Sequence, residues 1–549
     1  GASNVAVGAS ALVANTTGAD NTAVGKSALD SNTTGLSNTA VGMLCLDENS
    51  TGNYNTAIGK QALGNNTTAS NNTAVGFWSL LANTTGPSNS ALGQNALAAN
   101  TTGTGNTASG KDALDANTTG DYNVGLGYLA LSSNTTADDN TAVGTSALTA
   151  NTTGANNTAV GRKALLTNST GTSNTAVGWS ALQDNTTGEL NSAVGTSALQ
   201  TNTTGSQNTA VGRQSLLDNT TGDFNTGLGS GALANNTTAD HNTAVGKSAL
   251  FYNTTGEYNT AVGSQALMDN TTGVRNSAFG DSALANNTTG QYNTALGRES
   301  LFYNTTGVSN TAVGKDALIS NTTAGSNTAV GESALYANTT ASSNAAFGSN
   351  TLKACTTGEA NASFGAYASF SNTTGTCNTI LGMQSGYYIT NGSGNIVVGS
   401  MTHAGQYSPV FGIVGEDNRI VMGTTTVTNA YVKVAWTVTS DQRDKADITD
   451  FTHGLDYINE LRPVNYVWDE RSNYADGISD GSKKKDLTQL GFLAQEIEAV
   501  ETSLGITNNC VVDKEDVDNL KITETKLIPI LVNAIKELSA KNDALETQN

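Results

Sequence analysis

The 549-residue sequence predicts a mainly β fold, in which a long solenoid shaft is followed by a small α+β domain that ends in a coiled-coil helix. Three observations predict this fold. A glycine, the marker glycine, recurs every 17 residues from Gly8 to Gly399 without an insertion or deletion. The density of charged residues rises near Ser440, and the last segment has coiled-coil spacing. We expect a shaft, a β-rich connector and a C-terminal domain at residues 1–399, 400–440 and 441–549.

The repeat has the composition of a solenoid coil. Because surface loops accept length changes at little cost, an unbroken period indicates that each residue stacks on its equivalent in the next coil. In each repeat the segment Thr-Ala-Val favours a short strand, and the glycine after it favours a positive φ or a close backbone approach. The stretch from Ala28 to Gly35 is compatible with a second strand or a helical turn. The 24 marker glycines, at about 4.8 Å per coil, predict a rod on the order of 110 Å.

Adjacent apolar pairs indicate that shafts pack side by side. Each repeat carries equivalents of Ala28 with Leu29 and of Ala40 with Val41. Neighbouring side chains of an extended chain point to opposite faces, so one member of each pair is expected to face outward. We therefore expect the outward members to contact neighbouring chains in a parallel homotrimer.

Repeated asparagines are expected to form hydrogen-bonded ladders along the shaft. One predicted ladder contains Asn32, Asn66, Asn83 and Asn100, and a second contains Asn21, Asn38, Asn55 and Asn72. The same segments match the glycosylation acceptor pattern, for example at Asn15, Asn83 and Asn168. A glycan on almost every coil would clash with its neighbours, which favours the ladder interpretation.

Residues at the variable positions of the repeat are expected to line up as surface stripes. A basic stripe one residue after the marker glycine contains Lys26, Lys60, Lys111, Arg162, Arg213, Lys247, Arg298 and Lys315. An aromatic stripe twelve residues after it contains Tyr54, Tyr122, Phe224, His241, Tyr258 and Tyr292. Trp78 and Trp179 are further candidates for an exposed ligand-binding surface. Aromatic rings suit carbohydrates and basic rows suit anionic glycans, while a merely solvated surface is the other interpretation.

Composition excludes several functional classes. The net charge of -20 and the pI of about 4.4 exclude nucleic acid as a partner, because phosphate binding needs a basic surface. The scattered cysteines and histidines predict no disulfide framework, no metal site and no cofactor. No apolar run is long enough to span a membrane. The sequence starts inside a repeat without Met, and we expect a virion or cell-surface anchor before Gly1.

The composition changes near Ser440. Residues 441–549 contain 34 charged residues in 109, whereas residues 1–440 contain 36 in 440. Alternating residues from Val432 to Val438 predict a strand just before this boundary. Beyond it the pattern predicts a helix over 455–461 that ends before Pro463, a strand over 464–468, a polar loop over 472–486 and an apolar element from 491.

The last segment predicts a short coiled coil. Its apolar seam contains Leu531, Ile535, Leu538, Asn542 and Leu545, with spacings of four, three, four and three. The asparagine at an inner position favours a fixed register. This spacing permits dimers and trimers, and chains that run parallel along a rod favour trimers.

Five motifs in this region resemble the endosialidase-type intramolecular chaperone domain. They are Ser-Asp-Gln-Arg-Asp-Lys at 440–445, Gly-Leu-Asp at 454–456, Leu-Arg-Pro-Val-Asn-Tyr-Val-Trp at 461–468, Leu-Gly-Phe-Leu-Ala-Gln-Glu at 490–496, and Leu-Ile-Pro through Ala-Ile-Lys-Glu-Leu at 527–538. The resemblance implies the C-terminal domain of a phage tail fibre, tailspike or related fibre, which drives trimerisation and is often released by its own serine and lysine. The repeats resemble, more loosely, the β-roll heads of trimeric bacterial adhesins.

The resemblance implies roles for four residues. Ser440 would be the nucleophile and Lys445 the base, with Asp441 and Arg443 shaping the site, and Thr439–Ser440 is the simplest bond to be cut. A serine hydroxyl needs a nearby base, and a lysine acts as one only where burial or positive charge lowers its pKa. Trimer packing is expected to provide that burial. The alternative is that Ser440 and Lys445 only cap and solvate the first helix.

These observations together predict a trimeric, phage-like fibre on the virion surface that attaches to a host glycan or protein receptor. The first alternative is a bacterial trimeric surface adhesin or an extracellular structural filament. A polysaccharide-degrading tailspike would need paired carboxylates, and the shaft has few acids and no recurring close pair. Regular Thr rows also permit an ice-binding protein.

Overall fold

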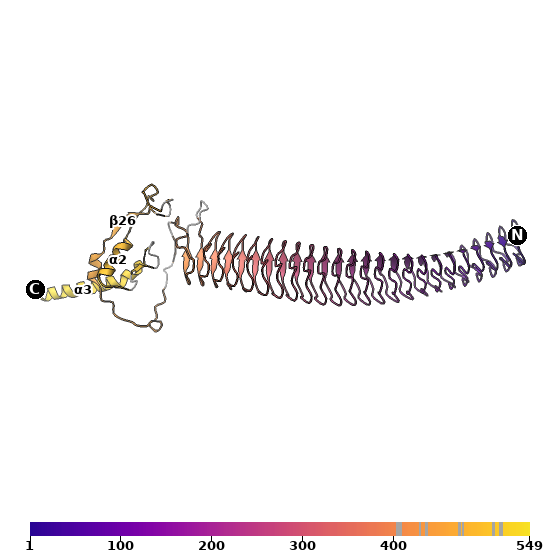
Figure 1. Ribbon diagram of the computed structural model, residues 1–549, viewed down its shortest axis with the longest axis horizontal. Helices are drawn as coiled ribbons and strands as arrows, with labels where there is room; N and C mark the ends of the chain where they lie inside the picture. The colour runs from indigo at the N-terminus through magenta and orange to yellow at the C-terminus, as the bar shows by residue number, and fades with distance from the viewer. Residues whose placement is uncertain are drawn as a thin grey trace. The chain divides into compact units, whose positions relative to one another are not determined.

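The computed structural model describes residues 1–401, 409–427, 430–433, 438–469, 471, 474, 477–507, 511–514 and 520–548. The chain divides into two compact units, Gly1–Ala430 and Tyr431–Asn549. The first unit is the shaft, drawn from indigo to orange in Figure 1, and the second contains the helices and two small sheets.

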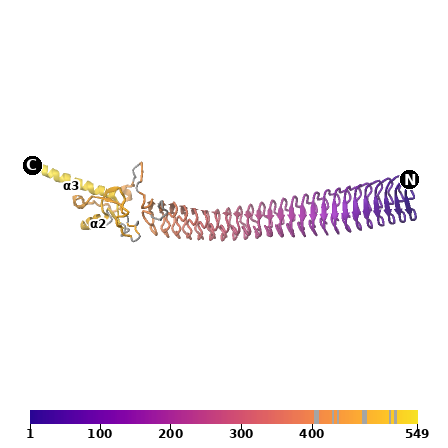
Figure 2. The same ribbon diagram turned by 90° about the horizontal axis from the view of Figure 1, so that it is seen from above.

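The shaft is a stack of coils that forms a parallel β-solenoid, as the sequence predicts (Figures 1 and 2). Each coil contributes one three-residue strand, and the strands form a single 25-stranded sheet. From β1 to β24, residues paired across neighbouring strands are 17 positions apart in the sequence. Ala40 and Ala57 are one such pair, so the 17-residue period of the sequence sets the register of the sheet. The strands are β1 (Val5–Val7), β2 (Thr22–Val24), β3 (Thr39–Val41), β4 (Thr56–Ile58), β5 (Thr73–Val75), β6 (Ser90–Leu92), β7 (Thr107–Ser109), β8 (Val124–Leu126), β9 (Thr141–Val143), β10 (Thr158–Val160), β11 (Thr175–Val177), β12 (Ser192–Val194), β13 (Thr209–Val211), β14 (Thr226–Leu228), β15 (Thr243–Val245), β16 (Thr260–Val262), β17 (Ser277–Phe279), β18 (Thr294–Leu296), β19 (Thr311–Val313), β20 (Thr328–Val330), β21 (Ala345–Phe347), β22 (Ala362–Phe364), β23 (Thr379–Leu381), β24 (Ile396–Val398) and β25 (Ile420–Met422).

The stack continues past the last marker glycine. β24 pairs in parallel with β25, whose residues come 24 positions later in the chain. The region 400–440, expected as a β-rich connector, therefore contributes a further rung to the sheet. Most of the strand expected from Val432 to Val438 lies outside the described residues.

The other side of each coil is a series of turns, neither the second strand nor the helical turn that the sequence permits. Ser27 and Leu29 both have a φ of 54°, which is left-handed. Because alternation of side chains holds only for extended chain, Ala28 and Leu29 are both fully buried inside the coil. The expectation that one of this pair faces outward is therefore wrong. It is correct for the pair in the strand, where Ala40 is buried and Val41 lies half-exposed on the surface.

The marker glycines are required for two physical reasons. Those from Gly8 to Gly365 have φ between 130° and 141°, a region that side chains disfavour. A Cβ on Gly178 would also lie 2.4 Å from the carbonyl oxygen of Gly195 in the next coil. The sequence predicts either a positive φ or a close backbone approach at the marker glycines. The structure has both.

The first predicted asparagine ladder is confirmed. Nδ2 of Asn83 donates hydrogen bonds to Oδ1 of Asn66 in the preceding coil and to the carbonyl oxygen of Gly86, both at 3.0 Å. The side chains of Asn83 and Asn168 are fully buried. This burial supports the ladder interpretation over glycosylation.

The second ladder is also confirmed, with a different bond. The backbone N–H of Asn38 donates to Oδ1 of Asn21 at 2.9 Å, and its Nδ2 donates to the carbonyl oxygen of Gly52 at 2.9 Å. The two asparagine rows therefore satisfy the buried backbone groups of the corner between them.

The second unit is a small α+β arrangement. Its elements are η1 (Gln442–Asp444), α1 (Leu455–Glu460), β26 (Val464–Val467), β27 (Thr488–Gly491), α2 (Ala494–Ser503), β28 (Val512–Asp513), β29 (Lys521–Ile522), η3 (Glu524–Lys526) and α3 (Leu527–Gln548). β26 pairs antiparallel with β27, and β28 with β29. The predicted helix before Pro463, the strand after it and the terminal helix are confirmed. Of the predicted polar loop, residues 472, 473, 475 and 476 lie outside the described residues.

A buried tyrosine organises the core of this unit. Tyr457 of α1 is fully buried and donates to Oε1 of Glu501 in α2 at 3.2 Å. The same oxygen accepts the backbone N–H of Val511 at 2.6 Å. Around Tyr457 pack Ile497 of α2 and Ile530 of α3, so the core joins all three helices.

Candidate self-cleavage site and ligand surface

Ser440 and Lys445 lie in contact at the start of the C-terminal domain. Nζ of Lys445 donates a hydrogen bond to Oγ of Ser440 at 2.6 Å. The short 3-10 helix η1 lies between them, and the backbone N–H of Lys445 donates to the carbonyl oxygen of Gln442 at its end. The two residues that the resemblance assigns as nucleophile and base are therefore paired.

Asp441 and Arg443 form a separate pair beside these residues. Asp441 caps η1 by accepting the backbone N–H of Arg443 at 2.9 Å. The guanidinium of Arg443 contacts both carboxylate oxygens, with Nε 3.1 Å from each. This contact holds the pKa of the Asp441 carboxyl below its ordinary value. The structure thus places Asp441 and Arg443 where they shape the turn that carries the serine and the lysine.

The serine and the lysine are both exposed on a single chain. In this contact Nζ of Lys445 is the donor and Oγ of Ser440 the acceptor, whereas a general base accepts the proton of the hydroxyl. A lysine becomes such a base where burial or positive charge disfavours its ammonium form. One chain therefore holds the geometry of a Ser-Lys pair without the buried environment.

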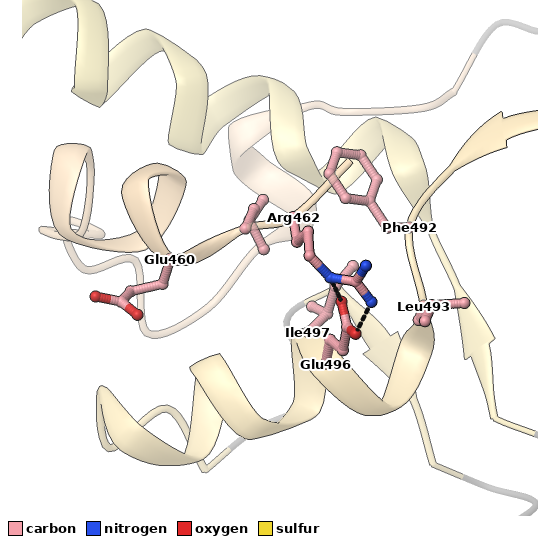
Figure 3. Close-up of a pocket in the computed structure, with 7 residues that line it drawn as sticks. Glu460, Arg462, Phe492, Leu493, Glu496 and Ile497 are labelled. Carbon is pink, nitrogen blue, oxygen red and sulfur yellow. Dashed lines mark hydrogen bonds and ion pairs between the residues drawn. The ribbon is translucent and has the colours of Figure 1, made fainter. Parts of the chain in front are cut away.

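Two motifs that carry the resemblance meet at a small pocket between α1 and α2. Arg462, which follows α1, forms a two-pronged ion pair with the carboxylate of Glu496 in α2, and its Nε lies 3.2 Å from Oε2 (Figure 3). Phe492 and Ile497 line the same pocket. The pair connects the chain around Pro463 to α2.

Part of the aromatic stripe forms a continuous column on the shaft. The rings of Phe224 and His241 stack at 4.9 Å, and those of His241 and Tyr258 at 4.9 Å. Arg275 continues the column, with its guanidinium carbon 5.4 Å from the ring of Tyr258 and 5.7 Å from that of Tyr292. We call these five residues the aromatic column. The rings of Phe224, Tyr258 and Tyr292 are about half exposed.

The predicted stripe contains only aromatic residues and therefore does not include Arg275. The 17-residue register identifies it directly, since it follows Gly263 by twelve residues. Acidic residues stand one position earlier in three of the five coils of the column, at Asp223, Asp240 and Glu257. Oδ1 of Asp240 accepts the backbone N–H of Asp223 at 2.7 Å, so these acids also hold the corner.

The remaining predicted surface aromatics are exposed but lie elsewhere along the shaft. Tyr54 and Tyr122 are each 61% exposed, and Trp179 is 48% exposed. Trp78 stacks on Phe77 at 4.5 Å and donates from Nε1 to Oε1 of Gln61 at 2.9 Å. The predicted ligand surface is thus one column and several separate rings.

The outward-facing members of the strand pairs, such as Val41, form a long apolar row on the shaft. The third residue of every strand from β1 to β24 is Val, Ile, Leu or Phe, except Ser109 in β7. We call this the outer apolar row. Its side chains are half-exposed to exposed, as at Leu92 with 56% and Leu381 with 52%. The row therefore consists of the third strand residue of successive coils from β1 to β24.

The predicted coiled-coil seam on α3 is a second apolar surface. Ile535 is 66% exposed, and Leu531, Leu538 and Leu545 are also exposed. Asn542 donates to Glu546 on the same helix at 3.4 Å. Among the described residues, no helix is both long enough and apolar enough to cross a membrane.

The C-terminal segment matches a known family. Residues 440–506 match the family model described as chaperone of endosialidase. Comparisons with curated proteins and with solved structures found no match. The matched segment begins at Ser440 and includes Lys445 and the Arg462–Glu496 pair. This segment is therefore an endosialidase-type chaperone domain, and together with the long β-solenoid it is consistent with a phage-type tail fibre.

Proposed function

We propose that this protein is a homotrimeric, phage-type fibre that attaches a virion to a host surface. Its C-terminal chaperone drives assembly of the trimer and then cuts the chain at Ser440. The observation that carries this proposal is the 2.6 Å contact between Nζ of Lys445 and Oγ of Ser440, at the first residue of the matched segment. The contact supports the proposal, because a serine nucleophile needs a base within hydrogen-bonding distance.

Two unpartnered apolar surfaces support self-association. The outer apolar row repeats once in every coil along the shaft. A surface that covers it should have the same spacing of apolar residues, and a second copy of the chain in parallel has that spacing. The seam on α3 supports the same parallel arrangement at the other end of the chain. The number three follows from the endosialidase-type chaperone, which assembles trimers.

The proposed cleavage needs only the chain and water. Lys445 removes the proton of Ser440, and Oγ attacks the carbonyl carbon of Thr439. The bond between that carbon and the nitrogen of Ser440 breaks, and the lysine returns its proton to the nitrogen. Water then hydrolyses the ester on Oγ, which leaves a carboxyl on Thr439 and restores the serine hydroxyl.

Assembly would control this reaction. Packing of neighbouring chains around Ser440 and Lys445 would bury the lysine and disfavour its ammonium form. Cleavage would then follow correct assembly. Removal of the chaperone would leave a fibre that unfolds slowly. The fibre assembles with the help of the chaperone, and once the chaperone has been cut off, unfolding cannot follow the same pathway backwards.

The aromatic column supports attachment to a glycan. Its exposed rings provide apolar faces and edges, and Asp223, Asp240 and Glu257 beside it provide acceptors for sugar hydroxyls. Replacing Tyr258 by Ala is expected to reduce glycan-array signals of the trimer, whereas Ser309→Ala, in the same row, is not. Equal signals from both variants would contradict attachment through the column.

Denaturing gels and mass spectrometry of the purified chain test the cleavage. The natural sequence is expected to release residues 440–549, whereas Ser440→Ala and Lys445→Ala stay intact. Ser539→Ala and Lys541→Ala, which change the same residue types on α3, are the matched controls and are expected to cleave. Equal release from all variants, or no release from the natural sequence, would contradict self-cleavage while leaving the trimer proposal to its own test.

A further inference from the structure

A second aromatic surface surrounds Lys353 on the other side of the coil. Nζ of Lys353 lies 5.7 Å from the ring centre of Tyr336 in the preceding coil and 5.9 Å from that of Phe370 in the next. It also donates to Oδ1 of Asn350 at 2.8 Å. The ring of Tyr387, one coil further, stacks on Phe370 at 5.0 Å. The ammonium of Lys353 thus lies between two aromatic rings, one in the preceding coil and one in the following coil.

Two further tyrosines enlarge this surface. Tyr367 contacts Phe370 at 5.7 Å between ring centres, and Tyr388 contacts Tyr387 at 5.0 Å. Tyr336, Tyr367 and Tyr388 are 39%, 39% and 54% exposed. We call the six residues the Lys353 patch: Tyr336, Lys353, Tyr367, Phe370, Tyr387 and Tyr388.

The charge around the patch differs from that of the rest of the chain. Most of its residues stand five or six positions after a marker glycine. At these two positions earlier coils carry acids, namely Asp30, Asp47, Glu48, Asp115, Asp184, Asp218 and Asp269. From Ala285 to Tyr388 the same positions carry no acid, and Lys353 is their one charged residue. The patch is therefore a cationic site on a protein of net charge -20.

The same arrangement occurs in the aromatic column, where Arg275 lies between Tyr258 and Tyr292. There, however, Glu257 and other acids flank the rings. An anionic ligand would meet those carboxylates in the column. Beside the Lys353 patch the acid Glu332 stands four residues before Tyr336, but its carboxylate lies 3.6 Å from Nζ of Lys315, which offsets its charge. The two surfaces are thus suited to ligands of different charge.

We propose that the Lys353 patch binds a glycan chain that carries carboxylates, such as a uronic acid polymer. A carboxylate pairs with Nζ of Lys353, and the apolar faces of neighbouring sugars lie against Tyr336 on one side and Tyr388 on the other. Tyrosine hydroxyls supply further hydrogen bonds to sugar hydroxyls. A chain lying along the shaft meets a new ring or the cation at every coil. This site is independent of the aromatic column and of self-cleavage.

Titration calorimetry of the full chain with two acidic probes, oligogalacturonate and oligomannuronate, tests the proposal. At least one is expected to bind at concentrations up to about 1 mM. The methyl ester of the bound oligomer keeps the sugar rings and loses the charge, and it is expected to bind roughly tenfold more weakly. Added salt is expected to weaken binding of the acid more than that of the ester.

Variants locate the site. Lys353→Met is expected to reduce affinity for the acid roughly tenfold and to leave affinity for the ester unchanged. Tyr336→Ala is expected to reduce both. Lys163→Met, which removes a lysine from a distant coil, and Tyr252→Ala, which removes an exposed ring at the repeat position of Tyr388 in another coil, are expected to change neither.

Three results would overturn the proposal: no binding of either acid, equal binding of acid and ester, or no effect of Lys353→Met. Sedimentation of Lys353→Glu addresses a different occupant, a second copy of the chain. Loss of assembly in that variant would show that the patch joins chains and would also overturn the proposal. Unchanged sedimentation with lost binding of the acid supports it.

Discussion

Nζ of Lys445 lies 2.6 Å from Oγ of Ser440, although both side chains are exposed on a single chain. The turn through η1 and the cap by Asp441 are local, so the contact does not depend on neighbouring chains. A lysine base, in contrast, needs burial or nearby positive charge. A single chain therefore has the contact without the buried environment that the proposed reaction needs.

Disruption of the α3 seam is expected to stop cleavage without touching the cleavage site. Ile535→Glu would place like charges against one another in the seam, and we expect loss of the trimer together with a reduction of cleavage by roughly tenfold or more. Ala540→Glu adds the same charge to an exposed position of α3 outside the seam and is expected to assemble and cleave normally. Time courses on denaturing gels measure both. Normal cleavage by dissociated Ile535→Glu would show that assembly does not control the reaction.

Two glycines of one coil are expected to respond differently to the same substitution. Gly178→Ala forces a Cβ toward the next coil at a φ of 140°, with a backbone penalty of about 1–3 kcal/mol besides the clash. A Cβ on Gly171 would lie equally close to the next coil, 2.4 Å from the carbonyl oxygen of Gly188, but Gly171 does not have a positive φ. Ala69 and Ala137 stand at its position in other coils, so the coil accommodates Ala there. Hydrogen exchange around β11 is expected to increase in the first variant and to stay nearly unchanged in the second. Equal exchange in both would contradict the role of the marker glycines.

Loss of one ladder asparagine is expected to weaken the shaft locally. Nδ2 of Asn168 donates to Asn151 and to Gly171, both at 3.0 Å, and its Oδ1 accepts from Asn185 at 2.7 Å. Asn168→Ala leaves these buried groups unpaired, at a cost of about 1–3 kcal/mol in local stability. Thr170→Ala, on the exposed side of the same coil, is expected to cost much less. Local hydrogen exchange or limited proteolysis compares them, and equal effects would contradict the ladder as a source of stability.

Acidification is expected to stabilise the shaft near Asp47. Burial, together with the charges of Asp30 and Glu48, raises the pKa of Asp47 to about 6. The pKa of this carboxyl is higher in the folded chain than in the unfolded chain, where it is about 3.9. Its protonation therefore contributes stability that is fully present below about pH 3.9 and is lost as the pH rises through 6. Asp47→Asn is therefore expected to raise the melting temperature at pH 7 and to change it little at pH 4.

The same sign applies to Asp115, Asp218 and Asp269, whose pKa values burial also raises. Thermal melts of the natural chain and of Asp47→Asn between pH 4 and pH 8 measure the effect. A stabilisation by Asp47→Asn that is larger at pH 4 than at pH 7 would show that the sign is wrong.

The period of the repeat makes most of the shaft predictable from the sequence. An unbroken 17-residue spacing specifies which residues pair, and β1 to β24 follow it without exception. Both asparagine ladders and the corner glycines follow from the same register. The side of the coil that contains Ala28 and Leu29 was not predictable by alternation, because a left-handed φ at Leu29 turns both side chains inward.

The candidate sites were predictable only in part. The motif from Ser440 to Lys445 identifies the residues of the cleavage site, but it says nothing of their exposure, which depends on neighbouring chains. Arg275 and Lys353 were missed because cations between aromatic rings are recognised only when all residue types at one position of the repeat are read along the stack. The additional strand β25 could not be predicted from the period, because its residues follow those of β24 by 24 positions and not by 17.

The proposed assembly of three parallel chains is tested most directly by sedimentation equilibrium of the Ser440→Ala protein, which keeps its chaperone domain. We expect a single species with three times the chain mass of 55.9 kDa, at concentrations where Ile535→Glu sediments as one chain. A Ser440→Ala protein that sediments as a monomer or dimer would contradict it.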